Sequence, residues 1–160
     1  KNGVPAAQAR IIHADICPGY TNRGPQDAAR HKNDYAVARV DSDALYTWAG
    51  EYVKLTEQEP ISRAELLRSV LNVAGYPDHE GPITLKTDSG SILANTLTNS
   101  NFSYTMDTMP GESGCPVFRY QADSKTFLLA GVHVAGYANA NVARRYDAEM
   151  QSRIRTWLRA

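Results

Sequence analysis

The sequence has few cysteines and no metal-binding pattern. Only two of its 160 residues are cysteines, Cys17 and Cys115. Two are too few for a metal cluster, and no Cys-x-x-Cys or His-x-x-x-His spacing occurs. A glycine-rich phosphate loop is also missing, so we expect no metal and no cofactor. The cysteines leave three states open: a disulfide between them, a disulfide to another chain, or free thiols.

The chain also lacks an excess of either charge and a long apolar run. Lys+Arg and Asp+Glu both number 17, which gives a formal net charge of zero. No basic surface for nucleic acid or a membrane is therefore expected. The longest weakly polar run, residues 126–138, is shorter than the roughly 20 residues of a membrane helix. No targeting segment is visible, and because the chain opens K-N-G-V-P without Met, we expect Lys1 to be a processed or nicked end.

What the sequence does contain is a series of short apolar stretches separated by turn residues. They predict strands at residues 9–17, 34–40, 70–76, 83–87, 91–97, 102–106, 116–118, 127–134 and 142–146, with a turn at Asp88–Gly90. Residues 18–33 are predicted to be a loop and 45–55 an irregular crossing segment. A Ser62/Glu65 capping-box pattern predicts a helical turn at 60–67, and helical spacing predicts an amphipathic helix at 148–158. The pattern is typical of an all-β fold with barrel or sandwich character.

The stretch Asp107–Phe118, D-T-M-P-G-E-S-G-C-P-V-F, places Ser113 in a frame of small residues. A serine becomes a nucleophile when a base takes its proton and N–H groups stabilise the oxyanion that forms. Gly111 has no side chain, so its N–H can approach a substrate carbonyl closely. A surface turn rich in small residues is the alternative. The nucleophile elbow of α/β-hydrolases does not fit, because Cys115 stands where that motif has Gly.

Four motifs together resemble the chymotrypsin-fold serine proteases, and within them the V8-like glutamyl endopeptidase branch. They are N-D-Y-A-V-A-R-V, G-Y-P-D, the serine stretch, and A-G-V-H-V-A-G, in that order. The resemblance implies an all-β fold of two six-stranded barrels with the active site between them. This chain would hold the end of the first barrel (residues 1–55), the whole second barrel (56–160) and a C-terminal helix. It implies a secreted serine endopeptidase acting on peptides or proteins.

The resemblance also implies roles for individual residues. Ser113 would be the nucleophile and Asp34 the triad carboxylate, and the N–H groups of Gly111 and Ser113 would form the oxyanion hole. The family's catalytic His precedes the Asp on the first barrel, so it falls before Lys1. We therefore expect a partner, the N-terminal chain of the same precursor, to carry that His.

The four histidines of the chain are interpreted separately. His13 is expected to lie on a strand face, and His79 is expected to be a loop residue. His31 is only three residues from Asp34, which makes it a poor candidate for the base. His133 would line the primary specificity pocket in the family plan, although a buried core His on a central strand is the alternative.

The resemblance implies a preference for Glu at P1, the residue before the cleaved bond. Thr108 and His133 would bind its carboxylate, and Gly136 would let the substrate backbone lie alongside as an added strand. Asp107 opens an alternative, a trypsin-like pocket for Arg or Lys. Under the glutamyl interpretation we expect Asp107 to point elsewhere and to be hydrogen-bonded.

Other departures from the family pattern leave further questions open. Glu112, before the nucleophile, would accept a hydrogen bond, pair with an amine, or be solvated. Cys115 is expected to be buried as a small hydrophobic side chain. Asn101-Phe102-Ser103 is a glycosylation sequon, a pattern common by chance. Because the expected His lies outside this chain, a catalytically inactive relative that serves as a binding module is the alternative function.

Overall fold

The protein is described by a computed structural model that covers residues 7–20, 28–49, 53–55, 57–78 and 84–159. The strands are β1 (Ile11–Ile16), β2 (Ala36–Val40), β3 (Leu71–Gly75), β4 (Lys86–Gly90), β5 (Asn101–Tyr104), β6 (Pro116–Gln121), β7 (Thr126–Tyr137) and β8 (Ala140–Arg145). The helices are α1 (Ala28–Asn33), α2 (Ala44–Ala49), α3 (Arg63–Arg68), the 3-10 helix η1 (Ala94–Thr96) and α4 (Ala148–Trp157).

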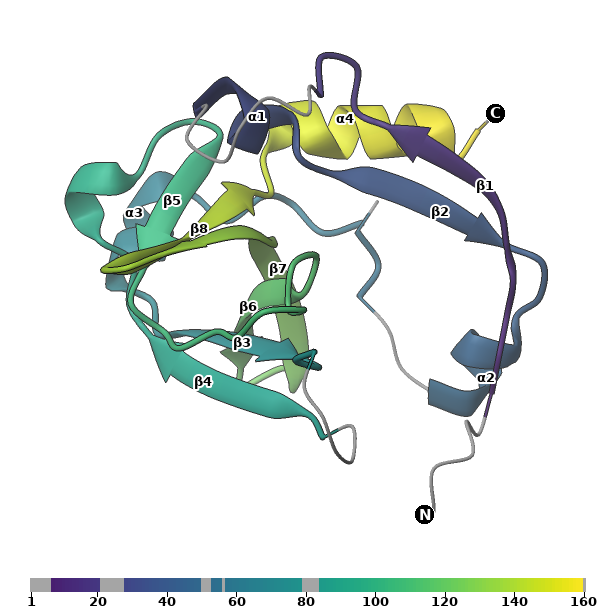
Figure 1. Ribbon diagram of the computed structural model, residues 1–160, viewed down its shortest axis with the longest axis horizontal. Helices are drawn as coiled ribbons and strands as arrows, with labels where there is room; N and C mark the ends of the chain where they lie inside the picture. Colours follow the sequence, from purple (N-terminus) through teal and green to yellow (C-terminus); the bar gives the residue numbers. More distant parts are fainter. Residues whose placement is uncertain (1–6, 21–27, 50–52, 56, 79–83, 160) are drawn as a thin grey trace.

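Most of the chain forms a six-stranded antiparallel sheet in the order β4-β3-β6-β7-β8-β5 (Figure 1). The two ends of this sheet meet. Just after β4, Ile92 forms a bridge with Tyr104 of β5, and the Leu93 N–H donates to the Ser103 carbonyl at 2.8 Å. The sheet therefore closes on itself as a barrel, which satisfies the edge groups that an open sheet would leave unpaired.

The barrel interior follows from alternation along the strands. In β3 Leu71 and Val73 are buried, in β5 Phe102 and Tyr104 are buried, and Val117 of β6 joins them. Successive side chains of a strand point to opposite faces, so every second residue enters the core. Cys115 lies in this core and Cys17 lies outside it; both are buried and free.

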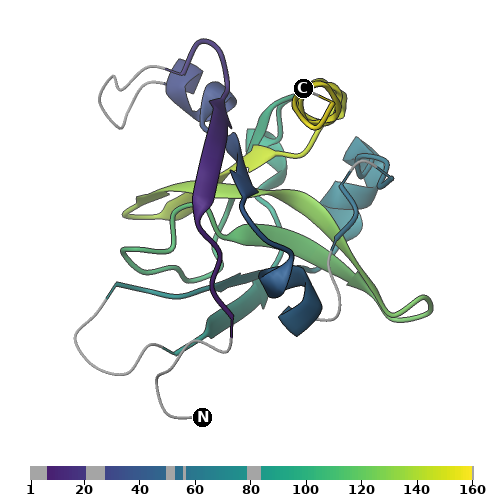
Figure 2. The same ribbon diagram turned by 90° about the vertical axis from the view of Figure 1, so that its right-hand side faces the viewer.

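The strands β1 and β2 form a separate antiparallel pair, which lies apart from the barrel and beside α4 (Figure 1, Figure 2). Its register runs from Ile16 opposite Ala36 to Ile11 opposite Val40. Three isoleucines of β1, namely Ile11, Ile12 and Ile16, are more than half exposed, at 62%, 52% and 61%. An isolated pair of strands with this much apolar surface is marginally stable in water.

The helix α4 connects the strand pair to the barrel. Asp147 caps it by accepting from the Met150 N–H at 2.8 Å, and Met150 and Ile154 face inward. These side chains share a second core with Cys17, which follows β1, and with Tyr35, which precedes β2. A single apolar cluster therefore fixes the β1–β2 side of the molecule against the barrel side.

The predicted hairpin at residues 83–97 is wrong. Ile83 lies outside the described residues, but Asp88–Gly90 forms the end of β4 and pairs with β3 in place of turning. The carboxylate of Asp88 accepts from the N–H groups of Ser89 and Asp107. Pairing with β3 therefore overrides the local turn tendency of these residues, and the following segment forms the Ile92 bridge and η1.

Two segments predicted to be irregular contain short helices. The predicted loop at 18–33 ends in α1, and the crossing segment at 45–55 begins with α2. Both helices contain good helix formers, such as the A-A-R-H-K run of α1, and no Gly or Pro. The other predicted strands and helices are confirmed within a few residues. The capping box of α3 is also confirmed, because Ser62 and Glu65 bond reciprocally.

Candidate active site

The loop that carries Ser113 lies between β5 and β6 and is held by main-chain bonds. The Cys115 N–H donates to the Glu112 carbonyl at 3.0 Å, and the Glu112 N–H donates to the Met109 carbonyl at 3.2 Å. Residue His133 of β7 clamps the far side, since its carbonyl accepts from Gly114 at 2.8 Å and its N–H donates to Cys115 at 2.9 Å. Ser113 itself remains exposed at the top of this loop.

Gly111 is required by both conformation and space. Its φ is +92°, a region that L-residues with a side chain rarely adopt. A Cβ there would lie 2.3 Å from the Asp78 nitrogen, because the Asp78 N–H donates to the neighbouring Pro110 carbonyl at 2.8 Å. Glycine therefore lets the G-Y-P-D motif pack directly on the serine loop.

Two N–H groups of this loop are left without partners. Within the part of the chain that the structure describes, neither the Gly111 nor the Ser113 N–H donates a hydrogen bond, whereas the N–H groups of Glu112, Gly114 and Cys115 all do. Unpaired donors next to a serine hydroxyl are the arrangement that an oxyanion hole requires. They belong to the residues that the sequence predicted for this role.

Asp34 lies between α1 and β2. Its side chain is 26% exposed and lies 3.8 Å from the Arg30 guanidinium. Burial raises the pKa of this carboxyl, while the nearby Arg30 and His31 oppose that rise. The carboxylate is therefore held in a partly dry position, as a group that orients a catalytic imidazole needs to be.

A cavity of about 520 Å³ brings Asp34 and Ser113 together. One wall comes from the β1–β2 side and the other from the serine loop and β7. The lining residues are Ile16, Tyr20, Asp34, Tyr35, Ala36, Ser113, Gly114, Val132, His133 and Val134. The predicted carboxylate, nucleophile and pocket histidine thus face one space.

Tyr35 fixes Asp34 relative to the barrel. The Arg144 guanidinium lies 5.2 Å from the centre of the Tyr35 ring, and Arg153 Nε donates to the Tyr35 hydroxyl at 3.0 Å. Arg144 is fully buried and pairs with Asp147, the N-cap of α4, at 2.7 Å. The residue beside the predicted triad carboxylate is therefore bound to β8 and α4 through two cations.

His133 is buried within the barrel, and its imidazole bonds to a residue that the sequence did not indicate. The Tyr104 hydroxyl lies 2.6 Å from His133 Nδ1, and the rings meet edge to face with their centres 6.1 Å apart. Burial lowers the pKa of His133, and the negative charge of Glu112 acts in the opposite direction. The sequence placed Tyr104 only within the predicted strand at residues 102–106, with no indication of a partner.

Glu112 is buried and hydrogen-bonded, so the solvated alternative is wrong. Only 4% of the residue is exposed, and its Oε2 accepts from the Met109 N–H at 2.7 Å. Its carboxylate packs on Gly75, where a Cβ would lie 3.0 Å from Oε1. Glu112 thereby places a negative charge under the nucleophile loop, and burial and this charge raise the pKa of Cys115 to about 11.

The remaining predicted residues lie outside the cavity lining. Thr108 is half-buried in the serine loop, Gly136 is exposed on β7, and Asp107 is exposed. The Asp107 N–H donates to Asp88 Oδ2 at 2.7 Å, so among the described residues the hydrogen bond that holds Asp107 comes from its main chain. Asp34, Ser113 and His133 thus line the cavity, whereas Thr108 and Gly136 do not.

The other histidines lie elsewhere. His13 is on β1, 3.3 Å from the Asp15 carboxylate, as expected for a strand-face residue. His31 is buried, and its Nε2 lies 2.7 Å from the Tyr137 hydroxyl at the end of β7. His79 lies outside the described residues.

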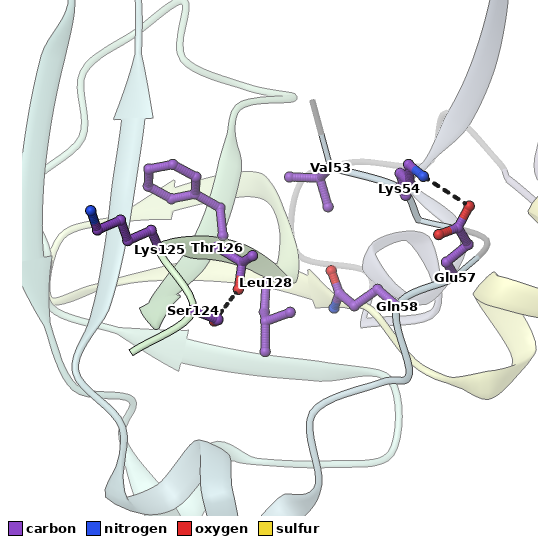
Figure 3. Close-up of a pocket in the computed structure, with 9 residues that line it drawn as sticks. Val53, Lys54, Glu57, Gln58, Ser124, Lys125, Thr126 and Leu128 are labelled. Carbon is purple, nitrogen blue, oxygen red and sulfur yellow. Dashed lines mark hydrogen bonds and ion pairs between the residues drawn. The ribbon is translucent and has the colours of Figure 1, made fainter. Parts of the chain in front are cut away.

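A second, larger cavity of about 830 Å³ contains none of the predicted site residues (Figure 3). Lys54 and Glu57 form an ion pair of 3.3 Å on one side, and the Ser124 and Thr126 hydroxyls lie 2.6 Å apart on the other. Its lining consists of Val53, Lys54, Glu57, Gln58, Ser124, Lys125, Thr126, Phe127 and Leu128. Size alone therefore does not identify the candidate site.

No cluster of three or more His, Cys, Asp or Glu side chains among the described residues is placed to hold a metal ion. None of the described helices is both long enough and apolar enough to cross a bilayer.

Comparison with solved structures identifies the fold. A Glu endopeptidase matches with a TM-score of 0.71 and 22% identity, over 95% of this chain and 65% of that one. A thermostable serine protease from an extremophilic microorganism matches with a TM-score of 0.63 and 17% identity, over 90% of this chain and 64% of that one. No protein-family model matches the chain, and no curated protein matches it in sequence.

The chain therefore has the trypsin-like fold of these serine proteases, with a closed six-stranded antiparallel sheet and a C-terminal helix. It spans about two thirds of the length of the structures it matches, 65% and 64%.

Proposed function

We propose that this chain is the C-terminal portion of a serine endopeptidase that cleaves peptide bonds through an acyl-enzyme. The observation that carries the proposal is the shared cavity of Asp34 and Ser113, two residues from opposite sides of the molecule. A carboxylate and an exposed serine that face one space, beside two unpaired N–H groups, form three parts of a serine-protease site.

The chemistry follows from these parts. A base takes the Ser113 proton as its Oγ attacks the substrate carbonyl, and the N–H groups of Gly111 and Ser113 stabilise the oxyanion. Collapse of this intermediate expels the amine, to which the base returns the proton. Water then releases the acyl group by the same steps in reverse order. Asp34 orients the base and stabilises its cationic form.

We further propose that the base is a His on a partner, the N-terminal chain of the same precursor. Residues 1–55 would be the end of the first barrel and 56–160 the second barrel, and the missing strands would pair with β1 and β2. The exposed Ile11, Ile12 and Ile16 support this, because such a strand pair is stable only when its apolar face is covered. The resemblance to the V8-like proteases further implies that the protein would be secreted.

Preference for Glu at P1 is the specificity that the site favours. His133 lines the cavity and Thr108 lies in the adjoining loop, so an imidazole and a hydroxyl are near the site for a carboxylate. Asp107 does not line the cavity, which argues against the Arg or Lys alternative. Gly136, on the same strand as His133, would lie along the substrate backbone.

A fluorophosphonate probe tests the catalytic part of this proposal. The chain is combined with its N-terminal part, treated with the probe, and analysed by denaturing intact mass. We expect a tag on Ser113 in the assembled protein and none in a Ser113→Ala variant. Folded, assembled protein that takes no tag would overturn catalysis and favour the binding-module alternative.

A P1-scanning peptide series tests the specificity. We expect cleavage after Glu to dominate, with little cleavage after Arg or Lys. Dominant cleavage after Arg or Lys would overturn the Glu preference and favour the alternative, a trypsin-like pocket that contains Asp107.

A further inference from the structure

The bond between Tyr104 and His133 crosses the inside of the barrel. Tyr104 lies on β5 and His133 on β7, with β8 between them in the sheet. Tyr104 is fully buried and His133 is 3% exposed. Both main-chain groups of His133 are bonded to the serine loop, so backbone and ring are fixed together. The imidazole therefore has one nitrogen, Nδ1, committed to Tyr104, and only Nε2 available to a ligand.

The protonation of the pair decides what Nε2 offers. Burial, together with the nearby Cys115 and Glu112 side chains, raises the pKa of Tyr104 far above its usual range, so the hydroxyl keeps its proton. Burial lowers the pKa of His133, so its imidazole is neutral near pH 7. Among the described residues the Tyr104 hydroxyl has no hydrogen-bond partner other than His133 Nδ1, so donation to Nδ1 is the arrangement that leaves no buried hydroxyl proton unpaired. A neutral imidazole that accepts a hydrogen bond at Nδ1 carries its proton on Nε2.

We propose that Tyr104 is a positioning residue that fixes the Nε2–H tautomer of His133, so that His133 donates a hydrogen bond to the acidic side chain of the substrate. The inference rests on the proposed function, and it names the residue that makes a buried, neutral histidine selective for a carboxylate. The other tautomer would present the Nε2 lone pair to the carboxylate oxygens, and two acceptors repel each other.

Protonation of the His133 ring makes the effect depend on pH. Of the titratable and charged groups around it, the Glu112 carboxylate and the protonated Cys115 thiol belong to the serine loop, Tyr104 to β5, and Asp34 to the same cavity, and its partner on β8 is the uncharged Ala143. At low pH the protonated ring carries an N–H on both nitrogens. The tautomer then no longer matters, and Tyr104 is dispensable for donation.

The test compares Tyr104→Phe with the native protein, each assembled with its N-terminal part, on peptides with Glu or Gln at P1. The amide of Gln both donates and accepts, so it tolerates either tautomer, whereas Glu only accepts. At pH 8 we expect kcat/KM for the Glu peptide to fall about tenfold through KM, the effect of losing a hydrogen bond to a charged group. The Gln peptide should change little, and the Glu defect should shrink at pH 5.

Tyr146→Phe is the matched control. Tyr146 is also buried, and its hydroxyl donates to the Leu55 carbonyl, at a residue that does not line the cavity. The Tyr146→Phe variant should lose stability but keep the native ratio of kcat/KM for the Glu peptide to kcat/KM for the Gln peptide. A Tyr104→Phe variant with the native ratio at pH 8 overturns the inference while leaving the proposed proteolysis intact. If the native protein cleaves no peptide, the proposed function itself fails.

A spectroscopic measurement tests the tautomer without activity. In ¹⁵N spectra of the His133 ring near pH 7, we expect Nε2 to be the protonated nitrogen in the native protein. A protonated Nδ1 in the native protein overturns the inference even if Tyr104→Phe fails to fold.

Discussion

Gly111 and Gly114 share a positive φ in different surroundings. Both have φ of +92°, but a Cβ on Gly111 would collide with the Asp78 main chain, whereas a Cβ on Gly114 would meet nothing within 4 Å. The two positions therefore separate the cost of a positive φ from the cost of a steric clash.

Alanine substitutions should show this difference. Gly114→Ala should lose about 1–2 kcal/mol of unfolding free energy, the cost of the left-handed conformation alone. Gly111→Ala should lose more, because it must also displace Asp78 from its bond to the Pro110 carbonyl. Urea unfolding of both variants measures the two losses, and equal losses would contradict the packing described here.

Asp34 is expected to destabilise the fold at neutral pH. Burial raises its folded pKa, so its contribution to stability is complete below the carboxyl's ordinary pKa and is lost as pH rises through the raised folded pKa. Asp34→Asn should therefore raise the unfolding midpoint at pH 7 and change it little at pH 3. Calorimetry at the two pH values makes the comparison.

Asp88→Asn is a control of opposite sign. Hydrogen bonds from the Asp107 and Ser89 N–H groups lower the pKa of Asp88. Its contribution to stability is therefore present above the ordinary carboxyl pKa and lost as pH falls through the lowered folded pKa. Its substitution should lower the midpoint at pH 7. If both variants shifted the midpoint in the same direction at pH 7, the burial of Asp34 would not be the cause.

At the scale of the element, the start of α4 joins a helix cap to a buried charge. Asp147 accepts from the Met150 N–H and also pairs with Arg144, whose side chain is 0% exposed. Ser62 caps α3 by accepting from the Glu65 N–H and bonding back to the Glu65 carboxylate, but Ser62 is exposed and pairs with no buried charge. The two helix starts thus have similar capping and different burial.

Removing the two caps should have unequal effects. Asp147→Ala leaves Arg144 buried without its carboxylate, so we expect a loss of about 3–5 kcal/mol. Ser62→Ala should lose about 1 kcal/mol, the usual value of a cap. Urea unfolding again provides the measurement. Similar losses of unfolding free energy in the two variants would mean that the ion pair between Arg144 and Asp147 contributes little to stability.

At the scale of the whole molecule, the chain consists of a closed barrel and an open strand pair. In the barrel β6, β7 and β8 each have strand neighbours on both sides, whereas β1 pairs only with β2. The open pair carries exposed isoleucines and is tied to the rest mainly through the second core around α4. Stability is therefore expected to be unequal across the fold.

Hydrogen exchange should reveal this inequality. In the chain alone, amides of β7 should exchange slowly and those of β1 fastest among the strands, because β1 has one neighbour and little burial. Adding the N-terminal part should slow exchange in β1 and β2. Mass spectrometry of peptides from each strand measures this, and a β1 that is already as protected as β7 would argue against a missing partner.

Local sequence patterns predicted much of this protein. Short apolar stretches bounded by turn residues predicted most strands, helical spacing predicted α4, and the Ser62/Glu65 pair predicted the cap of α3. The serine loop could be recognised because its chemistry lies within a few consecutive residues. The fold that these motifs implied agrees with the solved protease structures, whereas the roles of Asp34 and Ser113 stay predictions.

Only the tertiary structure decided the features that depend on distant partners. Asp88–Gly90 has the composition of a turn, but pairing with β3 makes it a strand. Tyr104 meets His133 because barrel closure turns β5 and β7 toward a common interior, and no local pattern encodes that meeting. Asp34 and Ser113 face one cavity because α4 fixes two sheets together. Propensity acts between near neighbours along the chain, whereas these contacts depend on register and packing.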